Sequence, residues 1–282
     1  MILALFGIAT DRCWLRHRAM NGRVRRAVLF AALVASPGLA SCAEWHGALG
    51  VSVQRFDNTE FDKAGTTLVR ESGWMPGLAA RVNWQANRFG VFAGGEVYHH
   101  GIAYHGQTQG GASAESTSAT RLIQLRAGAS YAVNGHLAGF VAGEWDVWRR
   151  DIDSTASAAG LQERSASARL VLGGRGHWET ATSGVFGIEG ALVLARPERL
   201  DVGFSGLLDA TSLTTRSAHG WRVGVSARPA AAPRLELRAG LDTITVARSG
   251  DVPLMRGGRF VGTIAQPEHA RRSISVTLSR LF

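Results

Sequence analysis

The sequence predicts an all-β fold, a closed antiparallel up-and-down transmembrane β-barrel of about ten strands. Three observations predict it. Apolar and polar residues alternate in segments of about ten residues, the pattern of strands with one apolar and one polar face. The connections between these segments are alternately short and long, and both ends of the mature chain lie on the side of the short ones. Beyond residue 43 no run of about 20 apolar residues suits a membrane helix, whereas a closed barrel satisfies every backbone group in lipid.

Each predicted strand has one apolar face. The strands are, in order, 45–56, 74–85, 89–104, 118–132, 136–150, 161–178, 185–194, 215–227, 235–246 and 271–282. The short connections at 86–88, 133–135, 179–183 and 228–233 are predicted turns, and those at 57–70, 105–117, 151–160 and 247–270 are predicted loops. The stretch 196–213 is predicted to be a loop or a strand extension. The apolar faces are Leu49, Val51, Val53; Leu78, Val82, Trp84; Phe89, Val91, Val97; Ile123, Leu125, Tyr131; Leu137, Val141, Trp145; Ala168, Leu170, Leu172; Phe186, Ile188, Leu192; Trp221, Val223, Val225; Leu235, Leu237, Leu241; and Ile274, Val276, Leu278.

The last strand, RRSISVTLSRLF at 271–282, alternates strictly and ends on an aromatic residue. It resembles the C-terminal signature of bacterial outer-membrane β-barrel proteins, whose final strand carries an assembly signal ending in Phe. The resemblance implies the outer membrane of a Gram-negative cell, short periplasmic turns, long extracellular loops, and recognition of the strand ending in Phe282 by the barrel-assembly machinery. Arg280 departs from the pattern because it falls on the apolar face, and we expect it to reach the headgroups at the periplasmic rim.

An upstream extension and a secretory signal peptide are predicted over residues 1–43, and the outer-membrane barrel domain over 44–282. From Met20 the chain has a basic segment with three arginines and then an apolar segment at 27–35, too short to span a membrane. This order is typical of export through the general secretory route. Two processing sites stay open: ordinary cleavage after Ala43, which we favour, and lipidation of Cys42, since residues 39–42 resemble a lipobox.

The basic character of the chain lies mostly in this leader. Residues 1–42 contain six Arg and one Asp, so the formal net charge of +9 falls to +4, from 25 basic and 21 acidic side chains. That balance argues against a nucleic-acid partner. The only cysteines, Cys13 and Cys42, precede residue 44, so we expect neither disulfide nor thiolate metal site in the mature chain. No cofactor and no metal are predicted.

Aromatic residues gather where the strands meet the short turns, as expected of an interfacial girdle. They are Trp45, Trp84, Phe89, Tyr131, Trp178, Phe186 and Phe282.

Charged residues on the polar faces are predicted to form a luminal charge network. A barrel of about ten strands is near the size at which side chains fill the interior, and the Arg fork pairs well with carboxylates. We therefore expect a largely charge-plugged lumen, with a narrow solute channel lined by charge rings as the alternative. The predicted network is Arg81, Glu96, Arg126, Glu144, Asp146, Arg169, Arg175, Glu189, Arg222, Glu236, Arg238 and Asp242.

The rim offers candidates for chemistry. A ten-strand barrel resembles the omptin proteases in architecture, and those enzymes use an Asp pair facing an Asp-His pair. The nearest residues here are Asp151 and Asp153, with His105 or His269 as a possible base. No Asp-His dyad occurs at corresponding spacing, so we lean away from an enzyme. A rim protease or a hydrolase acting on lipid A stays an alternative. At most His100 and His105 could share a metal, since adjacent histidines point to opposite faces of a strand, and an aromatic belt is the favoured interpretation there.

The connection at 104–120, YHGQTQGGASAESTSAT, is rich in Gly, Ser, Thr and Gln. Its composition resembles loops that hydrogen-bond polysaccharide or lipopolysaccharide, and it equally suits a flexible solvated loop. The expected partners are therefore outer-membrane lipid, lipopolysaccharide and a surface polysaccharide. The predicted function is a non-enzymatic barrel that serves as a surface-binding or envelope-structural protein.

Overall fold

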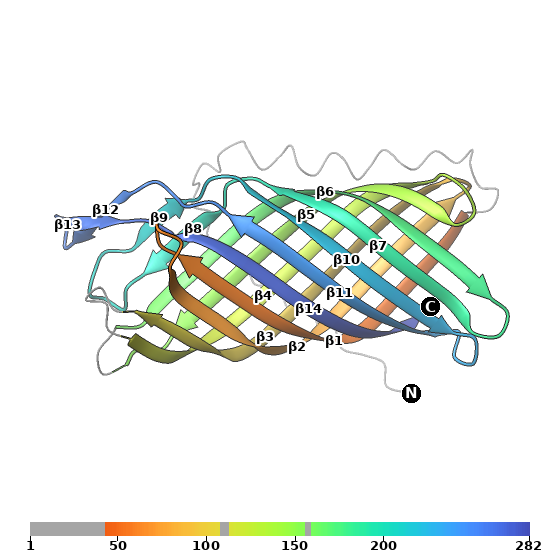
Figure 1. Cartoon of the computed structure of the whole chain (residues 1–282), viewed down its shortest axis with the longest axis horizontal. Coiled ribbons are helices and arrows are strands. Elements are labelled where there is room, and N and C mark those ends of the chain that lie inside the picture. Colours follow the sequence, from red (N-terminus) through yellow and green to blue (C-terminus); the bar gives the residue numbers. More distant parts are fainter. Residues whose placement is uncertain (1–42, 108–112, 156–158) are drawn as a thin grey trace, which may run out of the picture. The chain divides into compact units, whose positions relative to one another are not determined.

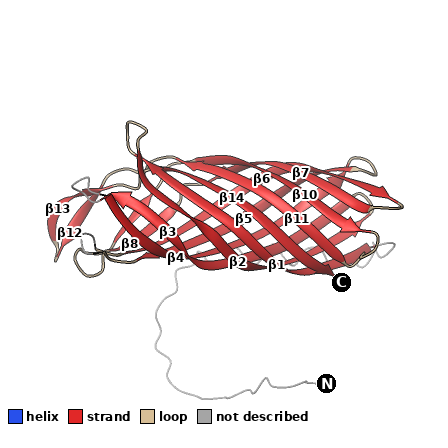
Figure 2. Ribbon diagram, turned by 60° about the horizontal axis from the view of Figure 1, so that its bottom comes forward, coloured by secondary structure: helices blue, strands red, loops and turns tan. Residues whose placement is uncertain are grey.

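The computed structural model describes residues 43–107, 113–155 and 159–282. Ten of its strands form one closed antiparallel barrel, which confirms the predicted fold class (Figures 1 and 2). The barrel closes where the last strand pairs with the first, and the amide of Phe282 donates to the carbonyl of Gly47 at 2.9 Å. The barrel strands are β1 (Ala43–Phe61), β2 (Thr67–Ala86), β3 (Phe89–Gln107), β4 (Ser113–Ala132), β5 (Leu137–Ile152), β6 (Leu161–Thr180), β7 (Gly184–Ala195), β10 (Ala218–Pro229), β11 (Leu235–Val246) and β14 (Glu268–Leu281).

The two ends of the barrel differ. We call the end with the four short connections the turn end, and the opposite end the hairpin end. At the hairpin end the strands run on beyond their predicted limits, and two further hairpins rise from it, β8 (Arg199–Gly203) with β9 (Thr211–Thr214) and β12 (Val252–Arg256) with β13 (Arg259–Ile264) (Figure 1).

Much of the sequence predicted as loop at 57–70, 105–117 and 247–270 is therefore strand. The stretch at 196–213, predicted as a loop or a strand extension, contains β8 and most of β9. The stretch at 104–120 is paired as well, with His105 opposite Glu115, and only residues 108–112 of it lie outside the described ranges. The physical reason is that apolar alternation ends where lipid ends, while backbone pairing continues. A strand that meets water on its outer face no longer shows the alternation used to find it.

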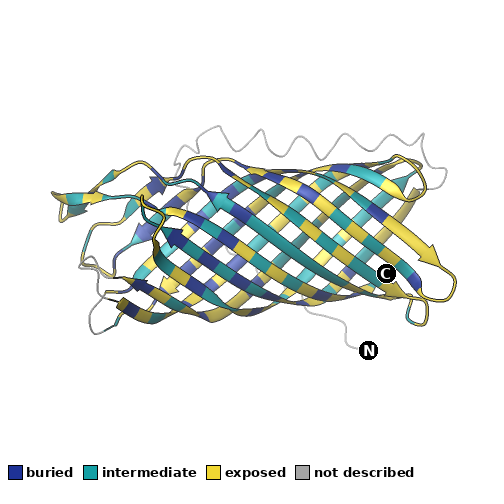
Figure 3. Cartoon of the chain, in the orientation of Figure 1, coloured by how far each residue is buried: buried dark blue, intermediate teal, exposed yellow. Residues whose placement is uncertain are grey.

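The apolar face of the sheet points outward, as predicted. Leu125, Val141 and Leu170 are 52%, 44% and 45% exposed on the outer wall, whereas the Arg126 and Arg169 side chains are 22% and 3% exposed in the interior. Figure 3 shows buried and exposed positions alternating along the strands. Within the described ranges no helix is long and apolar enough to cross a membrane.

The aromatic girdle lies at the turn end. Trp45 pairs in register with Trp84, Phe89 with Tyr131, and Trp178 with Phe186. The guanidinium of Arg280 lies 5.6 Å above the ring of Phe282, so the residue that breaks the apolar pattern is accommodated by a cation–π contact.

The leader, the signal peptide and the lipidation candidate Cys42 lie outside the described residues, and the division into 1–43 and 44–282 stays a prediction.

Candidate functional site

All of the predicted luminal residues lie on the inner wall, and they divide into two groups along the barrel. In the half near the turn end, Arg222 donates to Glu144 at 2.6 Å and Arg126 to Glu189 at 3.1 Å. Arg81 and Glu236, 155 residues apart in sequence, form a bidentate pair. We call this group the turn-half network; its members are Arg81, Glu96, Arg126, Glu144, Arg175, Glu189, Arg222, Glu236, Arg238 and Asp242.

The turn-half network lines the lumen without filling it. A cavity of about 1180 Å³ lies among its arginines and extends to His46, Gly135 and Phe282 at the turn end. Small inward-facing residues such as Gly94 and Ser130 leave this space. The expectation of a largely charge-plugged lumen therefore needs revision for this half, because ten strands enclose more volume than these side chains occupy.

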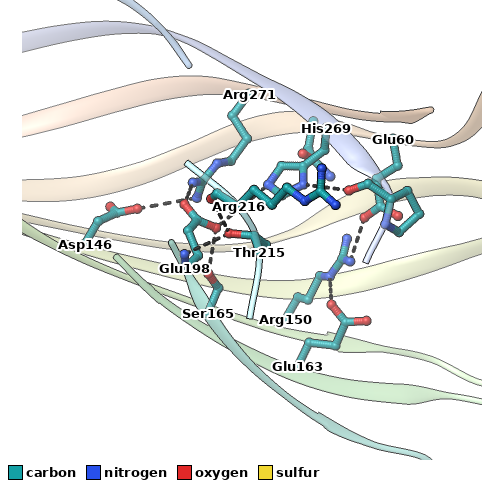
Figure 4. A network of polar contacts seen from close by, with 12 residues as sticks. Glu60, Asp146, Arg150, Glu163, Ser165, Glu198, Thr215, Arg216, His269 and Arg271 are labelled. Carbon is teal, nitrogen blue, oxygen red and sulfur yellow. Dashed lines mark hydrogen bonds and ion pairs between the residues drawn. The ribbon is translucent and has the colours of Figure 1, made fainter. Parts of the chain in front are cut away.

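The other half is closed by a second set of ion pairs. Arg150 from β5 donates to Glu60 at 2.8 Å and to Glu163 at 2.6 Å, and a third carboxylate, Glu71, also binds its guanidinium (Figure 4). The Arg150 side chain is 5% exposed, and Glu71 is fully buried. Three carboxylates from β1, β2 and β6 thus share one guanidinium inside the barrel.

A neighbouring cluster continues this closure. Arg271 bridges Asp146 and Glu198 (Figure 4). Arg169 also donates to Asp146, at 2.6 Å. Ser165 also donates to Glu198, at 3.0 Å. We call the two clusters together the hairpin-half network: Glu60, Glu71, Asp146, Arg150, Glu163, Arg169, Glu198, His269 and Arg271.

Glu198 lies in the connection between β7 and β8. Burial alone would raise the pKa of the Glu198 carboxyl, but the positive charge of Arg271, with smaller contributions from His269 and Arg169, outweighs burial and lowers that pKa. Glu198 is therefore ionised at neutral pH and serves as the counter-charge for Arg271.

Apolar side chains seal the space between these ion pairs. Trp148, 5% exposed, packs edge-on against Phe56 with ring centroids 5.4 Å apart. The guanidinium groups of Arg150 and Arg271 lie 4.8 Å and 5.5 Å from the Trp148 ring. Met75, Tyr98, Ile102 and Leu122 complete this apolar layer. The interior at this level is packed with buried side chains, in contrast to the cavity in the turn half.

Sequence reasoning missed most of the hairpin-half network. Glu60, Glu71, Glu198 and His269 fell outside the predicted strands, and Arg150, Glu163 and Arg271 fell near the ends of predicted strands and were not predicted to be luminal. The sequence nevertheless contains a pattern that could have identified some of these residues. In β1 the inward parity that begins at Ser52 continues to Glu60, and in β5 the parity of Glu144 and Asp146 continues to Arg150. Extending the alternation past the last apolar outward residue finds these side chains.

The rim candidates do not converge. His105 lies 3.6 Å from Glu115, whereas Asp151 is exposed opposite Ala119 and Gln162, and the backbone of Asp153 is bonded to Ser116 and Thr117. His100 and His105 are five residues apart on one strand, so they lie on opposite faces and cannot share a metal. The part of the chain that the structure describes has no group of three or more His, Cys, Asp or Glu placed to hold a metal.

The two hairpins at the hairpin end share a small core of their own. Leu200, Leu213 and Leu254 are buried together with Val202 and Phe204. The Asp209 carboxylate accepts from the amides of Gly257 and Gly258 at the tip of β12–β13, and these bonds lower its pKa. We call β8, β9, β12, β13 and residues 204–210 the outer platform. The outer platform therefore has its own packed core and is not a set of independent loops.

This architecture, an apolar outer wall, an aromatic girdle, an ionic interior and closure between first and last strands, is that of the outer-membrane β-barrels. Comparison with solved structures agrees. The chain is similar to the outer membrane protease OmpT from Escherichia coli, with a TM-score of 0.55 and 10% identity over 84% of this chain and 96% of OmpT.

Two further solved structures are similar at lower scores. The translocator domain of the autotransporter NalP from Neisseria meningitidis has a TM-score of 0.46 and 11% identity, over 86% of this chain and 90% of that domain. Neisserial surface protein A (NspA) has a TM-score of 0.36 and 10% identity, over 85% of this chain and 99% of NspA. No family model matches the chain, and no curated protein matches it in sequence. These likenesses concern the fold.

Proposed function

We propose that the protein is a closed, non-conducting barrel of the outer membrane that acts as a surface-binding or envelope-structural protein. In this proposal the chain is exported through the general secretory route and assembled through its last strand, ending in Phe282. The turn end faces the periplasm and the hairpin end faces the outside. The girdle at the short turns and the platform at the other end support this orientation.

The observation that carries the proposal is the sealed hairpin half. An aqueous path needs polar groups that water can reach, whereas Arg150, Asp146, Arg169 and Arg271 have side chains at most 5% exposed. Their carboxylate partners and the Trp148 layer occupy the same level of the lumen. The cavity in the turn half therefore ends blindly at this layer and opens toward the periplasm.

A closed lumen predicts that the protein does not conduct ions across a planar bilayer. Purified, folded protein is expected to add no conductance steps, while a general porin inserted into the same bilayer serves as the positive control. Discrete steps that change when Arg126→Ala or Glu144→Ala is introduced would instead establish the narrow channel.

The outer platform is where we propose that surface binding occurs. Its tip exposes Phe260 and Val261, 64% and 49% accessible, beside Arg256 and Arg259, which pair in register. An exposed aromatic ring stacks on the apolar face of a sugar ring, and a neighbouring arginine pairs with acidic groups. A surface polysaccharide is the partner that this tip suits.

A binding experiment tests this role. Purified O-antigen polysaccharide freed of its lipid is titrated against the folded protein in detergent. The double variant Phe260→Ser with Val261→Ser is expected to lose about tenfold in affinity. Val133→Ser is the matched control, since Val133 is 61% exposed at the turn end. Equal affinity of wild type and double variant would remove the platform tip from the proposal.

A further inference from the structure

Three arginines stand side by side on the outer wall of the barrel. Arg121 in β4 pairs in register with Arg149 in β5, and Arg149 pairs with Arg164 in β6. All three are exposed, while their neighbours Leu122, Arg150 and Ser165 are buried inside. His99 in β3 lies directly opposite Arg121 and extends the line. We call these four residues the arginine row.

The arginine row has no counter-charge between its members. None of its arginines has a carboxylate within 4.0 Å among the described residues. Two carboxylates lie at the edge of the row, Asp151 two residues after Arg149 and Asp201 opposite Arg164. Asp201 accepts hydrogen bonds from Ser212 at 2.6 Å and from Arg199 at 3.2 Å, and these bonds, with a smaller contribution from the charge of Arg164, lower its pKa. Like charges directly opposite one another across strands destabilise a sheet.

Asp151 follows Arg149 on the outer face of β5 with the same spacing as Asp57 after Arg55 in β1. The two pairs differ in contact, because Arg55 donates to Asp57 at 3.2 Å, whereas no ion pair joins Arg149 to Asp151 among the described residues. The row is therefore a set of three adjacent guanidinium groups whose acidic neighbours do not bind them.

The depth of the row indicates what it meets. Two residues toward the turn end from Arg121 and Arg149 are Ile123 and Val147, where the apolar wall begins, and Val97 stands two residues below His99. The row therefore lies at the boundary between the apolar band and the polar surface, where lipid headgroups lie. A shallow groove of about 610 Å³ opens over it, also lined by the polar residues Asp151, Gln162, Asp201, Thr211 and Ser212.

We propose that the arginine row binds the phosphate groups of an anionic glycolipid of the outer leaflet, the lipopolysaccharide expected as a partner. Planar guanidinium groups donate two hydrogen bonds at a time to phosphate oxygens, and adjacent forks spaced by strand pairing reach more than one phosphate. The hydroxyls of Thr211 and Ser212 lie where sugar hydroxyls would pass through the groove. This inference rests on the proposed orientation of the barrel but not on its closure.

The test uses the folded protein in detergent and the triple variant Arg121→Gln, Arg149→Gln, Arg164→Gln. Without lipid, the triple variant is expected to resist urea at least as well as wild type, because repulsion is relieved. On addition of purified lipopolysaccharide, the wild-type urea midpoint should rise, and the variant should need about tenfold more lipid for the same rise. Arg55→Gln with Arg272→Gln is the matched control and should respond as wild type does.

Three further arms decide the source of the phosphate. Enzymatically dephosphorylated lipopolysaccharide should give no rise in the midpoint, and inorganic phosphate at equal phosphorus concentration should give none. An equal rise for wild type and triple variant, or an equal rise with inorganic phosphate alone, overturns the assignment. Whether the protein conducts in a planar bilayer does not affect these urea titrations. The experiments therefore distinguish a failure of lipopolysaccharide binding by the arginine row from a failure of the closed-lumen proposal.

Discussion

Replacing Arg150 with methionine is expected to lower the free energy of unfolding by about 3–5 kcal/mol, because three buried carboxylates then lose the guanidinium that they share. Glu60, Glu71 and Glu163 all bind this guanidinium, and their side chains are 6%, 0% and 9% exposed. Methionine keeps much of the volume, so the loss reports charge rather than a cavity. Urea unfolding of the reconstituted barrel, followed by tryptophan fluorescence and by the gel mobility of the folded form, measures it.

The neighbouring residue supplies the control for this prediction. Arg149→Met changes the same residue type on the same strand but on the exposed outer face, and it should shift stability by about 0.5 kcal/mol or less in detergent. Adding Glu163→Gln to Arg150→Met should restore part of the loss, since one carboxylate fewer is left without a partner. A loss below about 1 kcal/mol for Arg150→Met would show that the three carboxylates do not depend on Arg150.

Replacing Trp148 with alanine is expected to cost about 3–5 kcal/mol by opening a cavity in the packed layer of the lumen. The indole contacts Phe56 edge-on and lies against two guanidinium groups, so both apolar packing and cation–π contacts are lost. The same urea titration measures the effect, and Trp148→Phe should retain a large part of the stability.

Trp145 is the matched comparison, because it lies on the same strand but faces outward and is 49% exposed. Trp145→Ala should cost clearly less than Trp148→Ala, since detergent or lipid refills the space that the side chain leaves. If the two alanine variants are equally destabilised, the layer around Trp148 is not the packed core that its burial indicates.

The hairpin-half network shows how far sequence reasoning reached at the site and where it stopped. Asp146 and Arg169 were predicted as luminal because they lie on strands with an apolar outward face. Glu60 and Glu198 were not, because the outward residues beside them no longer contact lipid and the alternation disappears. The sequence also could not show which charged residues pair with one another. The contact of Arg81 with Glu236, for example, depends on closure of the barrel between β1 and β14.

The cavity and the arginine row are also features that the sequence did not predict. The three arginines of the row lie within three residues of an end of a predicted strand, but only the register of β4, β5 and β6 brings Arg121, Arg149 and Arg164 into line. The open space in the turn half likewise depends on how far opposite walls stand apart. Side-chain composition alone suggested a filled interior.

The sequence by itself determined that the chain forms a barrel, how many strands it has and which face of each strand meets lipid. These properties follow from a period of two between apolar residues and from the lengths of the connections, both of which are local. Only the tertiary structure decided where the lumen is sealed, which charges neutralise one another and which arginines are left facing outward. Those properties depend on register and closure, which join residues far apart in the chain.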